Sequence, residues 1–244
     1  MFRLLQEFLF VSNIQARVWM KECQNIIDRA LGTKHLDRYG PGKGRRNDIL
    51  VIRAGEAGKS GSLYAKRYAE ENYLYVRSVV DLNGVIDHLN QNSSQYVGAV
   101  VVDDFIGTGR SMDVFLDEIV IVLRTAGFDF PIFAVALLAF DRGVEFVERG
   151  IKKRGNQDVR LIVGRTLYDD DRAFSSTSKV FPDAFDRDSA RALALDLGTR
   201  LVSKDPLGYD DMEALVAFED NIPNDSLPIL WASDQNWVPL FRRL

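Results

Sequence analysis

The sequence predicts an α/β protein with a doubly wound, mainly parallel sheet and helices on both faces. Two apolar runs, 97–102 and 132–140, are nearly continuous, which is typical of strands covered on both sides. Segments with helical spacing of apolar residues alternate with the strand-like runs, and this alternation indicates βαβ units. Hydrophobic residues make up 46% of the chain, with 18 glycines and only 7 prolines, which excludes disordered and collagen-like proteins.

The N-terminal part predicts helices ahead of the sheet. We expect a helix in 1–11 and a long amphipathic helix over 14–31, which Gly32 ends. The apolar positions of the long helix are Ile14, Val18, Cys23, Ile26, Ile27 and Leu31.

A basic, glycine-rich loop follows at 34–46. Its cations include Lys34, Lys43, Arg45 and Arg46. They could contact a polyanionic partner or a neighbouring subunit's pyrophosphate, but a loop exposed to water is the interpretation we favour.

The core elements follow in regular order. Expected strands cover 49–52, 73–76, 97–102, 132–140 and 159–163, and expected helices cover 62–71, 85–89, 113–125 and 143–153. From Tyr168 the regularity ends, and the later expectations are a helix over 189–201, a strand over 215–218 and an aromatic tail that packs on the core. The run Asp169–Asp171 could contact Mg²⁺ through water, although a loop exposed to water is the commoner role.

Size and charge limit the classes of function. We interpret the 244 residues as one decorated domain: a helical extension and basic loop at 1–46, a core at 47–167, and an insertion with a C-terminal extension at 168–244. The net charge of −4 gives no global attraction to nucleic acid or acidic membranes. Cys23 with two histidines offers neither a disulfide nor a convincing zinc site, and no apolar run reaches membrane-spanning length, so we expect a cytoplasmic protein.

The segment 100–111 carries the clearest chemistry. A buried strand leads to Asp103 and Asp104, which would emerge at the ligand-binding edge of a doubly wound sheet. Adjacent carboxylates suit a sugar diol, because ionised oxygens accept the hydrogen bonds that hydroxyls donate. The following turn and helix start form an anion cradle of backbone N–H groups, glycines and hydroxyls: Ile106, Gly107, Thr108, Gly109, Arg110 and Ser111. The alternative is an ordinary surface turn after a core strand.

A second glycine-rich segment follows the first expected core strand. Its residues are Gly55, Glu56, Ala57, Gly58, Lys59, Ser60 and Gly61. A P-loop is one alternative, but that motif requires glycine where Arg53 stands, and a structural turn is another.

The first segment resembles the phosphoribosyl pyrophosphate signature of type I phosphoribosyltransferases. The matching residues are Asp103, Asp104, Thr108, Gly109 and Ser111, whereas Arg110 stands where that family often has a small residue and Ser111 where it usually has Thr. The resemblance implies that the two acids hold the ribose, that 106–111 bind the 5′-phosphate and that 55–61 bind pyrophosphate. Mg²⁺ would be held mainly by the ligand, with the two acids as the candidate protein contacts.

The C-terminal segment, 223–231 with Trp237 and Phe241, is similar to phosphoribosyltransferase-like effectors of bacterial conflict and retron operons. This resemblance implies an antiviral effector with operon-encoded protein partners. Independently of it, we expect no membrane partner, because the apolar runs are short, and we expect a homo-oligomer. The acceptor is an unknown base or nucleotide, and we expect a hood over it from 168–182 and the tail. Two alternatives are a non-catalytic module that senses phosphoribosyl pyrophosphate or binds a partner, and a P-loop hydrolase.

Overall fold

The computed structural model describes residues 2–34, 36–54, 60–92, 96–234 and 236–241. The chain forms two compact units, one of Ala16–Thr166 and one of Met1–Gln15 with Leu167–Leu244. The predicted division of a single decorated domain at residues 46 and 167 stays a prediction.

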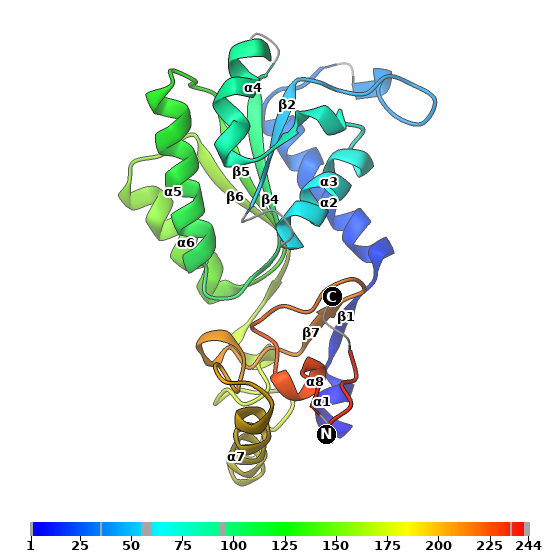
Figure 1. The fold of residues 1–244 in the computed structure, drawn as a ribbon, viewed down its shortest axis with the longest axis vertical. Helices are drawn as coiled ribbons and strands as arrows, with labels where there is room; N and C mark the ends of the chain where they lie inside the picture. The colour runs from blue at the N-terminus through cyan, green and yellow to red at the C-terminus, as the bar shows by residue number, and fades with distance from the viewer. Residues whose placement is uncertain (1, 35, 55–59, 93–95, 235, 242–244) are drawn as a thin grey trace. The chain divides into compact units, whose positions relative to one another are not determined.

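The unit Ala16–Thr166 is built on a five-stranded sheet with strand order β3-β2-β4-β5-β6 (Figure 1). Strand β2 pairs in parallel with β3 and β4, and β4 pairs in parallel with β5. The predicted doubly wound, mainly parallel sheet is therefore confirmed. The strands are β2 (Ile49–Arg53), β3 (Val79–Val80), β4 (Gly98–Ile106), β5 (Ile132–Phe140) and β6 (Val159–Leu167).

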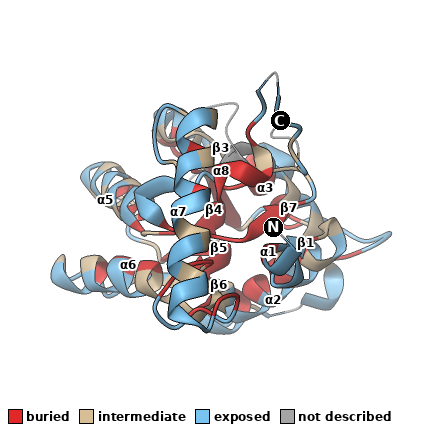
Figure 2. Cartoon of the chain, turned by 90° about the horizontal axis from the view of Figure 1, so that it is seen from below, coloured by how far each residue is buried: buried red, intermediate tan, exposed pale blue. Residues whose placement is uncertain are grey.

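Helices cover both faces of this sheet. Helices α5 and α6 lie on one side and α2 and α3 on the other (Figure 1). The strands are buried while the outer sides of the helices are exposed (Figure 2), which explains the near-continuous apolar runs of β4 and β5. The helices are α2 (Asn13–Ala30), α3 (Ser60–Glu71), α4 (Val85–Asn92), α5 (Arg110–Thr125) and α6 (Asp141–Lys153).

The expected strand at 73–76 is wrong. Tyr73 has a positive φ of 54°, Val76–Ser78 is a 3₁₀ turn, and the edge strand β3 begins at Val79. Left-handed backbone at Tyr73 breaks an extended run, although Arg46 and Tyr73–Tyr75 still exchange two backbone hydrogen bonds.

The buried face of α2 also differs from the apolar stripe that the sequence predicts. Ile14, Val18 and Ile26 are exposed, whereas Trp19 and Met20 are buried. Polar residues Gln24 and Asp28 share the buried side, so hydrophobicity alone could not locate it.

The interpretation of the basic loop as exposed fails at Arg46. Its side chain is only 2% exposed and forms ion pairs with Asp28 at 2.6 Å and Asp48 at 2.9 Å. Gln24 donates to Asp28, and the Tyr68 hydroxyl donates to Gln24. Arg46 therefore connects α2 to the start of β2 through a largely buried network of ion pairs and hydrogen bonds, in which each of these side chains has a partner.

The other unit has a two-stranded parallel sheet of β1 (Leu9–Val11) and β7 (Val216–Phe218). The sequence predicts β7 but not β1, because it extends the first helix through residue 11. Helices α1 (Phe2–Gln6), α7 (Ala184–Leu201) and α8 (Pro228–Trp231) complete the unit. The aromatic tail packs within it, since Trp237 and Phe241 contact the core of this unit and Phe241 stacks on Phe8 with centroids 4.6 Å apart.

Among the helices that the structure describes, none combines the length and the hydropathy that crossing a membrane requires.

Candidate functional site

The candidate site begins at the carboxyl ends of the parallel strands. The carboxyl ends of β3 and β2 lie level, because Val80 is opposite Ile52, whereas β4 continues to Ile106, four residues beyond Val102, which is opposite Arg53. Carboxyl ends of strands in open α/β sheets form the usual ligand crevice.

Asp103 and Asp104 lie within β4 rather than after it, because the strand continues to Ile106. Successive side chains of a strand alternate between faces, so Asp103 shares its face with Val101 and Asp104 shares the other face with Val102. Asp103 is partly exposed, whereas Asp104 is 3% exposed. One Asp103 carboxylate oxygen accepts a hydrogen bond of 3.0 Å from the Asp104 amide. Asp103 is thus the carboxylate of the pair that solvent can reach.

The predicted anion cradle is a tight turn between β4 and α5. Ile106 and Gly107 are buried, Thr108 is partly exposed, and Arg110 and Ser111 are exposed in the first turn of α5. Gly109 caps the helix in the left-handed region, with φ 81°, which a residue with a Cβ adopts only with strain. The cradle therefore presents a half-exposed hydroxyl, an exposed hydroxyl and the amino end of a long helix at one place.

The first turn of helix α6 packs against this turn. A Cβ on Gly143 would lie 2.3 Å from the Gly107 carbonyl oxygen, and a Cβ on Gly109 would lie 2.5 Å from the Gly143 carbonyl oxygen. Backbone therefore packs directly on backbone, and both positions need glycine. Sequence reasoning missed Gly143, although an isolated glycine inside a helical pattern often has a packing reason.

The predicted pyrophosphate loop lies mostly outside the described residues, since Gly55, Glu56, Ala57, Gly58 and Lys59 belong to the part that the structure leaves out. Ser60 and Gly61 begin α3.

Arg53 is the last residue of β2 and lies two positions before Gly55 in the sequence. Its guanidinium donates to Asp81, which follows β3, at 2.8 Å. Arg53 is a second residue that sequence reasoning missed, and a cation at a strand end beside a glycine-rich loop was the available signal.

A protein cage for a metal ion is not present among the described residues, where no three His, Cys, Asp or Glu side chains come together. Mg²⁺ commonly takes one or two carboxylates together with substrate phosphates. Asp103 suits such a contact because its carboxylate is partly exposed at the carboxyl edge.

The acidic side chains that follow β6, Asp169–Asp171, form ion pairs with residues nearby in the sequence. Asp169 pairs with Arg172, and Lys179 pairs with Asp170 and Asp171 at 3.0 Å each. Partial burial acts to raise the pKa of Asp169, but hydrogen bonds from Arg172 and Thr177 hold that pKa below its ordinary value. These contacts agree with a structural loop.

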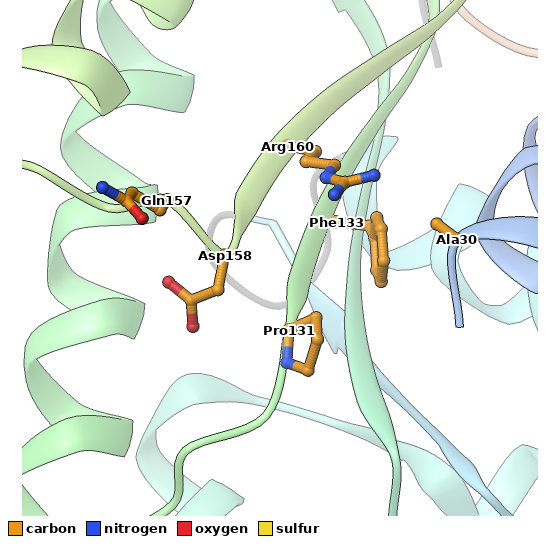
Figure 3. A pocket seen from close by; sticks show the side chains of 6 residues that line it. All are labelled: Ala30, Pro131, Phe133, Gln157, Asp158 and Arg160. Carbon is orange, nitrogen blue, oxygen red and sulfur yellow. The ribbon is translucent and has the colours of Figure 1, made fainter. Parts of the chain in front are cut away.

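A small pocket lies elsewhere, at the amino ends of β5 and β6 (Figure 3). Its volume is about 230 Å³, below the usual range of ligand pockets, and Asp158 in its wall pairs with Arg124. The lining residues are Ala30, Pro131, Phe133, Gln157, Asp158 and Arg160. It lies at the opposite end of these strands from the acids and the cradle, so we place the chemistry at the carboxyl edge.

Comparison with protein families gives a match over both units. A model of the PRTase-CE family matches residues 1–243. The chain belongs to the PRTase-CE family. This membership confirms the predicted phosphoribosyltransferase-like family, while the roles assigned to Asp103–Ser111 stay a prediction. A comparison with curated proteins gives no match.

Proposed function

We propose that this PRTase-CE protein binds phosphoribosyl pyrophosphate with Mg²⁺ and transfers the phosphoribosyl group to a base or nucleotide, releasing pyrophosphate. The observation that carries the proposal is the turn Gly107–Gly109 between two carboxylates of β4 and the amino end of α5, in a phosphoribosyltransferase-type chain. A diol and a phosphate separated by one ribose match this arrangement of acceptors and donors.

The cradle would hold the 5′-phosphate. Backbone N–H groups at the start of α5 donate to phosphate oxygens, and the helix dipole favours negative charge there. The hydroxyls of Thr108 and Ser111 add hydrogen-bond donors to the phosphate oxygens. Holding the ribose in the reactive geometry contributes roughly 7–11 kcal/mol in favourable cases.

Asp103 would accept hydrogen bonds from the ribose hydroxyls. Its charge also stabilises positive charge that develops on the ribose as the bond from C1 to pyrophosphate breaks. Mg²⁺, when bound with the ligand, neutralises charge on the leaving pyrophosphate. Lys59 and the amides of 55–61 are the proposed protein donors to that pyrophosphate, with Arg53 as a further cation at the same strand end.

Release of pyrophosphate tests the proposal. Purified protein is incubated with Mg²⁺, phosphoribosyl pyrophosphate and a panel of bases and nucleotides, and pyrophosphate is measured. We expect release with at least one acceptor and none with the Asp103→Asn, Asp104→Asn double variant, whose fold is checked by circular dichroism. Equal release by the double variant would contradict the assignment.

One observation favours a second function, binding without transfer. Asp104 is buried, so the described site offers one accessible carboxylate where the motif has two. A sensor of phosphoribosyl pyrophosphate predicts Mg²⁺-dependent binding in calorimetry with no pyrophosphate release for any acceptor.

The proposal extends to bacterial antiviral defence, supported by the similarity of 223–231, with Trp237 and Phe241, to conflict-operon effectors. Cells that carry the chain with its operon neighbours should resist phage infection, and Asp103→Asn should abolish that resistance. Full protection by the variant would separate defence from the site.

A further inference from the structure

An acidic residue lies in the first turn of α5, close to the proposed phosphate cradle. The Asp113 amide donates to the Gly109 carbonyl at 2.9 Å, so Asp113 stands one helical turn beyond the residue that caps the helix. That separation is about 6 Å along the helix axis. A carboxylate there stabilises the free helix terminus, but it repels a phosphate dianion bound at the same terminus.

Arg154, which follows α6, neutralises this carboxylate. Both terminal guanidinium nitrogens of Arg154 donate to Asp113, one of them at 3.1 Å, and the Arg154 Nε lies 3.3 Å from Asp117. The side chains are 25% and 17% exposed for Arg154 and Asp113, so water screens the pair only partly. The hydrogen bonds from Arg154 to Asp113 raise the pKa of the Arg154 guanidinium.

The ion pair between Arg154 and Asp113 also depends on a glycine in α6, Gly150. A Cβ on Gly150 would lie 1.9 Å from the Asp113 Oδ1 atom, so a larger residue at 150 would displace the carboxylate. Helix α6 therefore meets the start of α5 at two places: Gly143 supports the cradle backbone, and Gly150 with Arg154 encloses the acid one turn later.

We infer that Arg154 is a positioning residue for the 5′-phosphate: it neutralises Asp113 and thereby preserves the anion affinity of the cradle. The inference rests on the proposed function, because it names how the same site keeps its charge favourable. A merely structural ion pair between α5 and α6 would account for the contact but not for a dependence of ligand affinity on the charge at 113.

The test is calorimetric titration with ribose 5-phosphate, which carries the diol and phosphate but lacks pyrophosphate. We expect Arg154→Gln to bind it roughly fivefold more weakly than wild type, because an uncompensated carboxylate then lies one helical turn from the proposed phosphate position. Asp113→Asn in the Arg154→Gln background should restore affinity to within about twofold, since the repelling charge is gone. The deficit of Arg154→Gln should shrink in high salt.

Two further variants keep the test decisive. Arg124→Gln removes a comparable ion pair, with Asp158, at the other end of α5 and should bind as wild type does. If Arg154→Gln does not fold, Asp113→Asn alone decides, because it should bind ribose 5-phosphate at least as tightly as wild type.

The outcomes separate the two levels of the account. Equal affinity of wild type and Arg154→Gln, or no restoration in the double variant, or weaker binding by Asp113→Asn, would overturn the inference while the proposed function stands. No binding of ribose 5-phosphate by the wild-type protein would overturn both.

Discussion

The connections that follow β4 and β5 start at the same level of the sheet and have different structures. The two strands pair in parallel, and Ile106 is level with Ala139. After β4, the residues Gly107–Gly109 form a turn before α5 begins at Arg110, whereas α6 begins at Asp141 directly after β5 ends at Phe140.

The two connections at this edge of the sheet have different roles in our proposal: one binds the ligand and the other packs against the first. The connection after β4 is the proposed ligand site, with the partly exposed Thr108 next to the amino end of α5. The connection after β5 uses its first turn as a support, because Gly143 packs against the backbone of Gly107 and Gly109. The turn Gly107–Gly109 thus packs directly on the first turn of the neighbouring helix α6.

The largest expected effect is on the rate of pyrophosphate release, and it should differ between Asp103, which precedes the turn after β4, and Asp141, which follows β5. Asp103→Asn should lower the rate of pyrophosphate release by about 10²–10³-fold, because a charge placed for the reacting ribose is lost. Asp141→Asn, which alters a carboxylate that accepts a hydrogen bond from the Arg142 amide at 2.7 Å, should leave that rate within about threefold of wild type. Steady-state kinetics with the best acceptor measures both. Similar losses in the two variants would remove the functional distinction between the connections.

A smaller effect, on stability, tests the packing of Gly143 against the turn after β4. Gly143→Ala should lower the free energy of unfolding by about 2–3 kcal/mol, because its Cβ would overlap the Gly107 carbonyl. Gly84→Ala is the matched control in the same unit, since no atom lies within 4 Å of its Cβ and its φ is ordinary. It should change stability by about 0.5 kcal/mol or less. Urea denaturation measures the free energy of unfolding of both variants. An unchanged free energy of unfolding in Gly143→Ala would mean that the contact between Gly143 and the turn after β4 does not stabilise the fold.

The smallest effect concerns the connection after β6, where the acids pair with Lys179. Asp170→Asn with Asp171→Asn should leave Mg²⁺-dependent ligand affinity within about twofold and cost about 1 kcal/mol or less in stability, because half-exposed ion pairs contribute little. Calorimetry in the presence of Mg²⁺ measures the affinity. A large loss would show that this connection, like that of β4, serves the ligand.

The sequence could predict those elements whose signals are local. Residues 132–140 form a strand at the predicted bounds, because a fully buried strand is apolar throughout. The turn after β4 was predictable as well, since glycines and hydroxyls before a helix have a direct chemical meaning.

Contacts between distant segments could not be predicted in the same way. Arg46 looked like part of an exposed basic loop, and its burial depends on Asp28, 18 residues away. The burial of Asp104 depends on where β4 ends, which the preceding apolar residues do not determine. Gly143 contacts the turn only because α6 packs beside α5, and the role that we propose for Arg154 depends on the same packing.

A crystal structure with phosphoribosyl pyrophosphate and Mg²⁺ tests the central claim most directly. We expect the 5′-phosphate on the amides and hydroxyls of Gly107–Ser111, with a ribose hydroxyl on the Asp103 carboxylate. A 5′-phosphate bound away from this turn, with Asp103 not contacting the ribose, would contradict it.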